Sequence, residues 1–128
     1  MKSAFFSAAL LWAAPALASR LYAASYAGTV SSLSLEPASN GTGHLSVVSQ
    51  SSDCGPSPSW LMLDGPRDIL YCLDEGVDAP NGSITSFQTN ADGSLTSIKH
   101  IQTISGPVMS TLYSASGVPG RKFMAVAH

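Results

Sequence analysis

The sequence has few charged residues and few cysteines, and both shortages exclude classes of protein. Lysine and arginine total 6 and aspartate and glutamate total 8, so the formal net charge is −2. A protein that neutralises nucleic-acid phosphates needs a basic surface, so we expect no nucleic-acid partner. Two cysteines are too few for a disulfide-dense scaffold. The hydrophobic fraction of 45% excludes a disordered chain, and 128 residues allow one domain at most.

Long hydrophobic runs are also missing, apart from one at the N-terminus. Lys2 precedes an apolar run over residues 4–14, and a small-residue site ending at Ala18 follows it. This order is typical of a secretory signal peptide, so we predict a leader over residues 1–18 with cleavage before Ser19. A membrane anchor is the alternative, but a spanning helix needs about 20 apolar residues and this run is shorter. The sequence therefore predicts a secreted, extracellular protein with no membrane partner.

Secretion bears on two further features, the glycosylation sequons and the cysteines. Asn40 and Asn81 each begin an Asn-Gly-Thr or Asn-Gly-Ser triplet, so both are predicted to be glycosylated in a eukaryotic secretory route. Cys54 and Cys72 can pair in the same oxidising compartment, and closing that loop would stabilise the fold by about 3 kcal/mol. Cys72 lies in an apolar run, however, and is alternatively a small core residue. The sequence leaves both alternatives open.

The chain after the leader has no helical hydrophobic period. Short runs rich in Val, Ile, Leu, Tyr and Thr are separated by Asn-Gly, Asp-Gly and Ser-Gly turns. This alternation is typical of an all-β fold.

These strand-like runs repeat at a lag of about 50 residues. The matched positions are Gly28, Val30 and Leu33 with Gly82, Ile84 and Phe87; Gly43, Leu45 and Val48 with Gly93, Leu95 and Ile98; and Pro58, Trp60 and Leu63 with Pro107, Met109 and Leu112. Strands of the first repeat are predicted at residues 21–26, 29–35, 44–49 and 59–63. Four strands in a repeat of this length are typical of one blade of a β-propeller. The three-residue spacing of Val30 and Leu33 recurs in Ile84 and Phe87 and indicates a β-bulge.

The sequence therefore predicts about two blades and, from Lys122 onward, the first strand of a third. Residues 19–128 are expected to form the N-terminal portion of a propeller, because such rings close with about four to eight blades. The open faces would leave apolar surface and unpaired strand edges in water. We expect the chain to be a fragment of a longer product. The alternative is that copies self-associate through the open blade edges.

Several segments, in their order and spacing, resemble the lactonase family of seven-bladed propellers. The segments are residues 21–26 (LYAASY), 43–45 (GHL), 58–61 (PSWL), 70–75 (LYCLDE) and 82–87 (GSITSF). The family includes bacterial 6-phosphogluconolactonases and fungal carboxy-cis,cis-muconate cyclases. The resemblance covers nearly all of residues 20–128 but only the first third of a family member, and secretion fits a fungal extracellular branch better than the cytosolic bacterial enzymes.

The resemblance implies that the full-length form hydrolyses or forms a lactone, with a small-molecule lactone or carboxylate as substrate and no cofactor. The His, Arg and Glu residues proposed for catalysis in the muconate cyclases come from later blades, beyond His128. No catalytic residue is therefore assigned by matching, and the chain by itself is expected to be inactive. The alternative is a non-catalytic extracellular propeller that acts as a binding or surface module, because one fold hosts many functions.

The residues themselves offer Asp74, Glu75 and His128 as candidates for the central channel of the ring. Asp74 and Glu75 follow an apolar strand, and the alternative is that they are solvated carboxylates in a turn. For His128, the alternative is that the last residue of the chain is frayed. The cations after the leader are Arg20, Arg67, Lys99, Arg121 and Lys122. They do not cluster in the sequence as an anion clamp requires. His44 and His100 have no partner at ligand spacing, so no metal is predicted.

Overall fold

The computed structural model describes residues 18–128, and these residues fold into β-strands joined by turns. The predicted leader lies outside the described residues except for Ala18. The strands are β1 (Ser19–Ser25), β2 (Thr29–Pro37), β3 (Gly43–Ser51), β4 (Pro58–Asp64), β5 (Ile69–Asp74), β6 (Asn81–Thr89), β7 (Leu95–Ile104), β8 (Met109–Tyr113) and β9 (Phe123–Ala127). One turn of 3-10 helix, η1 (Gly65–Arg67), joins β4 to β5. Over residues 18–128, no helix is long and apolar enough to span a membrane.

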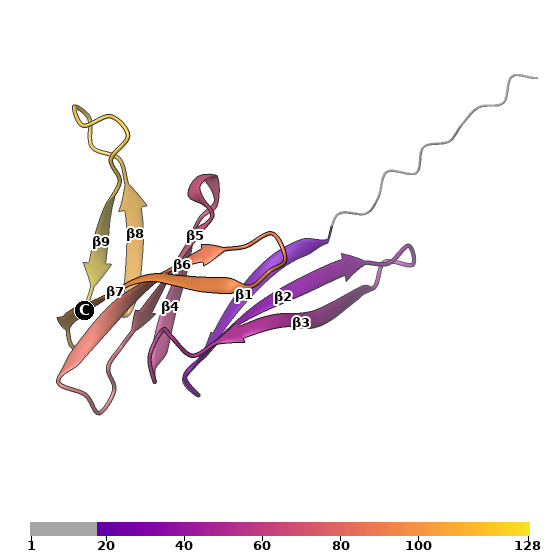
Figure 1. Ribbon diagram of the computed structural model, residues 1–128, viewed down its shortest axis with the longest axis horizontal. Helices are drawn as coiled ribbons and strands as arrows, with labels where there is room; N and C mark the ends of the chain where they lie inside the picture. The colour runs from indigo at the N-terminus through magenta and orange to yellow at the C-terminus, as the bar shows by residue number, and fades with distance from the viewer. Residues whose placement is uncertain (1–17) are drawn as a thin grey trace, which may run out of the picture.

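The strands form three antiparallel sheets that lie side by side (Figure 1). Sheet 1 has the order β1-β2-β3, sheet 2 has the order β4-β5-β6-β7, and sheet 3 consists of β8 and β9. Every ladder is antiparallel because short connections join strands that follow one another in the sequence. Strand β4 contacts both β1 and β8, so sheet 2 lies between the other two. The all-β class is confirmed, and the arrangement is that of a partial β-propeller.

The sheets are offset by one strand from the sequence repeat. The first three predicted strands form sheet 1, but the fourth, β4, pairs with β5 along Leu63↔Leu70 and Asp64↔Ile69. Grouping the four strands into one blade was therefore wrong by one strand. Internal similarity gives the length of a repeat but no starting point. The short connection through η1 decides the pairing, because it brings β5 back alongside β4.

Register shifts occur at repeat-related positions in sheets 1 and 2. One lies opposite Ser32 and Leu33 of β2, and the other lies opposite Ser86 and Phe87 of β6. The predicted bulges are confirmed in position, but the extra residue belongs to the partner strand. In sheet 1, Ser32 pairs with Ser49 and Leu33 with Val47, so it is β3 that carries the additional residue. An extra residue of this kind bends and twists the strand that carries it.

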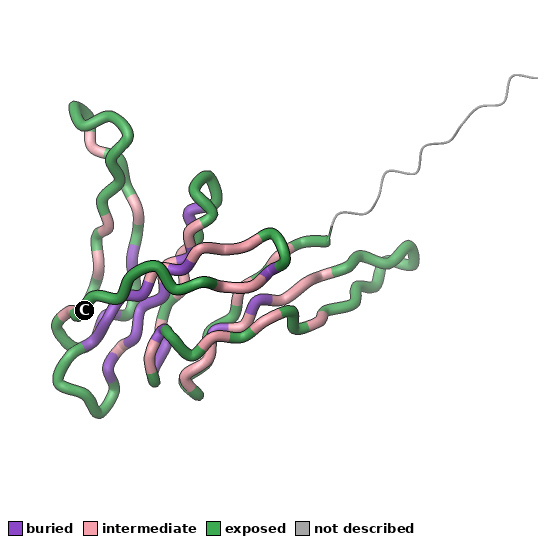
Figure 2. The backbone as a smooth tube through the Cα atoms, in the orientation of Figure 1, coloured by how far each residue is buried: buried purple, intermediate pink, exposed green. Residues whose placement is uncertain are grey.

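Sheets 1 and 2 enclose the main hydrophobic core. Its fully buried members are Val30, Cys54, Leu70, Cys72 and Phe87. Cys54 and Cys72 form a disulfide with a Cα–Cα distance of 5.9 Å, so Cys72 is both a core residue and a bridge partner. The bridge ties the connection that passes from sheet 1 to sheet 2 onto β5. Figure 2 shows buried positions concentrated in sheet 2, whereas the tips of the β2–β3 and β8–β9 hairpins are exposed.

Candidate functional site

Connections from all three sheets meet at one end of the structure, which we call the loop end. It comprises the β1–β2, β3–β4, β5–β6 and β7–β8 connections and the residue that follows β9. The backbone of Glu75 joins three of these parts, because its N–H donates to the Ser57 carbonyl (2.9 Å) and its carbonyl accepts from Gly106 N–H (2.9 Å). These bonds hold the backbones of three connections together at the loop end.

Asp74 is buried at the end of β5 and organises the loop end from within. Its Oδ1 accepts hydrogen bonds from the backbone N–H groups of Ser57 (2.8 Å) and Gly76 (3.4 Å). Gly55 leaves room for this carboxylate, since a Cβ at that position would lie 2.3 Å from Asp74 Oδ2. A buried carboxylate bonded to backbone amides fixes the two loops that supply them. Asp74 is thus a buried carboxylate that holds two loops and not a solvated turn residue.

Glu75 is the more accessible carboxylate and bridges sheets 1 and 2. Its Oε2 accepts a hydrogen bond from the hydroxyl of Tyr26, in the β1–β2 connection. Tyr26 and Glu75 are 49 residues apart and occupy equivalent positions in successive repeats. The hydrogen bond that Tyr26 donates to Glu75, followed by burial and by the charge of Glu75, raises the pKa of Tyr26 above its ordinary value of 10.0. The phenol therefore keeps its proton and points it at the carboxylate.

His128 reaches the loop end from sheet 3. Its Nδ1 lies 3.3 Å from the Ser105 carbonyl oxygen, in the β7–β8 connection, and its side chain is exposed. All three sequence candidates therefore lie at the loop end. In residues 18–128, however, no hydrogen bond or ion pair joins His128 to either carboxylate. A carboxylate beside a phenol, with an imidazole at the same end of the structure, supplies groups that serve as general acids and bases.

Metal binding receives no support from the described part of the chain. No group of three or more His, Cys, Asp or Glu side chains is placed to hold a metal ion there.

The opposite end of β4 carries a charge cluster that the sequence did not indicate. Asp64 is buried, and its Oδ1 lies 2.6 Å from Lys122 Nζ while its Oδ2 lies 3.6 Å from Arg67 Nη1. Arg67 also donates to the Gly120 carbonyl at 2.9 Å. Arg67 and Lys122 come together here although they are far apart in the sequence, because sheet 3 packs against β4. The two cations neutralise an internal carboxylate, so the cluster ties sheet 2 to sheet 3.

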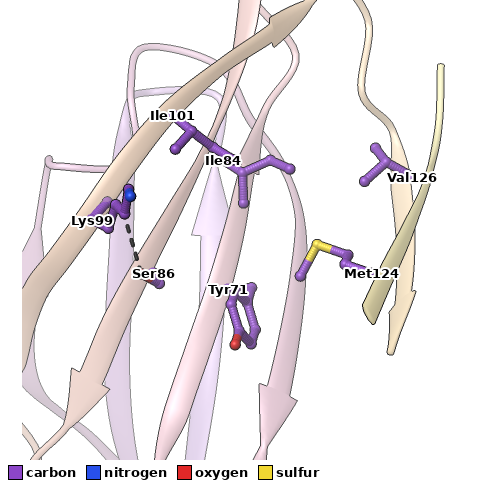
Figure 3. A pocket seen from close by; sticks show the side chains of 7 residues that line it. All are labelled: Tyr71, Ile84, Ser86, Lys99, Ile101, Met124 and Val126. Atoms are coloured by element: carbon purple, nitrogen blue, oxygen red, sulfur yellow. Dashed lines mark hydrogen bonds between the residues drawn. The ribbon is translucent and has the colours of Figure 1, made fainter. Parts of the chain in front are cut away.

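An apolar groove of about 330 Å³ separates sheets 2 and 3 (Figure 3). It is lined by Tyr71, Ile84, Ser86, Lys99, Ile101, Met124 and Val126. Met124 and Val126 project from β9 towards the face of sheet 2 that carries Tyr71 and Ile84. Sheet 3 has two strands and sheet 2 has four, so part of this apolar face stays uncovered.

Both sequons lie at the surface. Asn40 is exposed in the β2–β3 connection, where its Oδ1 accepts from Thr42 N–H (3.1 Å) and Thr42 Oγ1 (2.6 Å). Asn81 is the exposed first residue of β6. Glycosylation at either position stays a prediction.

Comparison with known proteins identifies the fold family. The family model described as "Lactonase, 7-bladed beta-propeller" matches residues 20–128, which include almost all of the three sheets. No match was found among curated proteins or among solved structures. The matched region carries the antiparallel sheets, repeat-related register shifts and side-by-side packing described above. The chain therefore belongs to the lactonase family of seven-bladed β-propellers.

Proposed function

We propose that the full-length form of this protein is a secreted lactonase-type propeller that hydrolyses or forms a small lactone, of the 6-phosphogluconolactone or carboxymuconate kind. The observation that carries the proposal is the family match over residues 20–128. The loop end supports it, because candidate acid–base groups from neighbouring sheets lie there together.

Glu75 is the residue of this chain that we assign to proton transfer. Opening a lactone requires a proton to leave the attacking water and a proton to reach the ring oxygen as its bond to the carbonyl carbon breaks. Glu75 has an accessible carboxylate, whereas Asp74 is bonded to two backbone amides. The Tyr26 hydroxyl holds Glu75 in place and serves as a positioning residue.

The test is turnover of the two lactone classes by the full-length form, secreted from its own gene. Hydrolysis of 6-phosphogluconolactone is measured through the base consumed at constant pH. Lactonisation of carboxy-cis,cis-muconate is measured through the loss of diene absorbance. We expect one of them to be turned over, with kcat lowered at least about tenfold in Glu75→Gln, as removal of a general base requires. Glu36→Gln, at an exposed position in β2, is the matched control and keeps the wild-type rate.

Folded protein that turns over neither substrate would contradict the proposal and favour the alternative, a non-catalytic extracellular binding module. The bonds that Asp74 makes within the fold are the observation that favours this alternative, because two backbone N–H groups occupy its Oδ1.

Secretion and glycosylation belong to the same proposal. Expression with residues 1–18 in a eukaryotic host is expected to release protein whose N-terminal residue is Ser19. Endoglycosidase treatment should lower its apparent mass, and Asn40→Gln and Asn81→Gln should each remove one glycan. Retention in the cell, or mass unchanged by the enzyme, would contradict this part of the proposal.

A further inference from the structure

The folded chain presents its two sequons in different ways. Asn40-Gly41-Thr42 and Asn81-Gly82-Ser83 both have glycine in the middle and differ only in the final hydroxyl residue. Since a sequon is defined by the asparagine together with the hydroxyl residue two positions later, the transferase has to reach both side chains. The accessibility of these two side chains therefore decides whether the folded protein can serve as an acceptor.

The first sequon occupies the tip of the β2–β3 hairpin. Residues 36–45 are all exposed, and Figure 2 shows this tip without buried positions. The Thr42 hydroxyl donates to Asn40 Oδ1 at 2.6 Å, a bond within the sequon itself. The turn is closed by the N–H of Gly41, which donates to the Ala38 carbonyl at 3.2 Å. Opening these bonds moves only the hairpin tip, so the folded protein can offer both side chains to the enzyme.

The second sequon is built into sheet 2. Asn81 is the exposed first residue of β6, but the two residues that follow it are buried. Ser83 pairs with Asp74 of β5 on one side and with Gln102 of β7 on the other. Its hydroxyl is buried and has no hydrogen-bond partner within residues 18–128. A transferase cannot reach this hydroxyl while both ladders are formed.

Gly82 holds the second sequon in the sheet, because its neighbours lie directly against it. A Cβ on Gly82 would lie 2.4 Å from Pro107 Cδ and 2.8 Å from the Asp74 carbonyl oxygen. Pro107 is itself fully buried, in the β7–β8 connection. Strand β6 therefore cannot present the sequon without separating from β5 and from this connection. That movement opens the interior of sheet 2, where the free energy of opening approaches that of global unfolding.

We propose that Asn40 accepts a glycan in the folded protein, whereas Asn81 accepts one only before β6 joins sheet 2. The inference rests on the glycosylation put forward above and adds the order of the two events. In each transfer, the asparagine Nδ2 forms a bond to the anomeric carbon of a lipid-linked oligosaccharide and loses a proton. The bond from that carbon to the lipid pyrophosphate breaks, and the pyrophosphate leaves. Occupancy of Asn81 is then set by competition between the transferase and the folding of sheet 2.

The test is transfer of oligosaccharide to the folded full-length form, produced without glycans in a bacterial periplasm, where disulfides form. The protein is incubated with purified oligosaccharyltransferase and its lipid-linked donor. A reduced tryptic digest of the same protein is the unfolded control, in which residues 21–67 carry Asn40 and residues 68–99 carry Asn81. Mass spectrometry measures the occupancy of each site. We expect similar occupancy of Asn40 in both samples. Occupancy of Asn81 should be at least about tenfold lower in the folded protein, because a buried strand is open in few molecules.

The variant Cys54→Ala/Cys72→Ala should open sheet 2 more often, because it lacks the bridge to β5. Transfer to Asn81 should rise at least about tenfold in this folded variant, whereas transfer to Asn40 stays at the wild-type level. Asn40→Gln and Asn81→Gln each leave one acceptor and confirm the assignment of the glycopeptides. Equal occupancy of Asn81 in the folded protein and in the digest would overturn the proposal, as would a folded protein that leaves Asn40 unmodified. A digest in which neither asparagine is modified would refute glycosylation of these sequons and, with it, the order inferred here.

Discussion

At the residue scale, the hydrogen bond from Tyr26 to Glu75 couples a tyrosine ionisation to the contact between sheets 1 and 2. The neutral phenol donates to the carboxylate, and this bond is the largest cause of the raised pKa of Tyr26. In Glu75→Gln the amide oxygen still accepts the bond but carries no charge. We therefore expect the pKa of Tyr26 to fall towards its ordinary value of 10.0 in this variant. Spectroscopic titration of tyrosinate, with Tyr26→Phe subtracted, measures the change.

The same coupling sets the sign of a stability change at alkaline pH. The pKa of Tyr26 is higher in the folded than in the unfolded protein. The contribution of Tyr26 to the free energy of unfolding is therefore fully present below pH 10.0, and it is lost as the pH rises through the folded-state pKa. Wild-type protein should thus lose more unfolding free energy across this window than Tyr26→Phe does. Parallel curves for the two proteins, measured by urea denaturation, would contradict the coupling.

At the element scale, the cluster at Asp64 fixes the β8–β9 hairpin to sheet 2. Lys122 immediately precedes β9, and Asp64 ends β4. Removing the cation leaves a buried carboxylate with only Arg67, at 3.6 Å. Lys122→Met should therefore destabilise the fold by about 3 kcal/mol, as loss of one partner of a buried pair does. Urea denaturation gives the total change, and amide hydrogen exchange in β9 shows whether the hairpin opens separately.

Removing the charge of Asp64 should lower the free energy of unfolding less than removing Lys122 does. The Lys122 and Arg67 side chains are 29% and 39% exposed and can turn to water. We expect Asp64→Asn to lower the free energy of unfolding by about 1 kcal/mol, the net contribution of an ordinary hydrogen bond. The double variant should resemble Asp64→Asn alone, because no buried charge is then left without a partner. Lys122→Met that is as stable as Asp64→Asn would show that the carboxylate is not held by this lysine.

The elements also show how far the sequence carries a prediction. The apolar runs and glycine turns placed the strands of sheet 1 and β4 to within two residues of their observed limits, because strand period and turn chemistry are local properties. The pairing of β4 with β5, rather than with sheet 1, depends on the geometry of the connection between them. The similarity between the sequence repeats does not reveal this geometry. The Asp64 cluster was missed for a related reason. Lys122 is 58 residues away, and only the packing of sheet 3 on sheet 2 brings the two together.

At the scale of the molecule, the Cys54–Cys72 bridge holds sheet 1 to sheet 2. Cys54 lies in the connection between the sheets, Cys72 lies in β5, and both are fully buried in the shared core. Replacing both with alanine should lower the unfolding free energy by about 3 kcal/mol, the chain-entropy value for a loop of this length. Urea denaturation of the oxidised wild type and of the variant measures it. A loss below about 1 kcal/mol would mean that the core alone orders the connection.

The uncovered face of sheet 2 predicts self-association of the chain from Ser19 to His128. Ile101 lines the groove between sheets 2 and 3 and is 46% exposed. Apolar surface beside an unpaired edge strand is removed from water when copies associate. We expect sedimentation velocity to show oligomers that increase with concentration.

A charge placed in the groove distinguishes this cause from general attraction between molecules. Ile101→Lys puts an ammonium group among Tyr71, Ile84 and Val126, where association would have to bury it without a partner. Gln102→Lys adds the same charge to the other face of β7, at the next position along the strand. The first variant should be mainly monomeric and the second should associate as the wild type does. Equal suppression by both would assign the effect to net charge, and a wild-type chain that stays monomeric at high concentration would show that sheets 2 and 3 close this groove themselves.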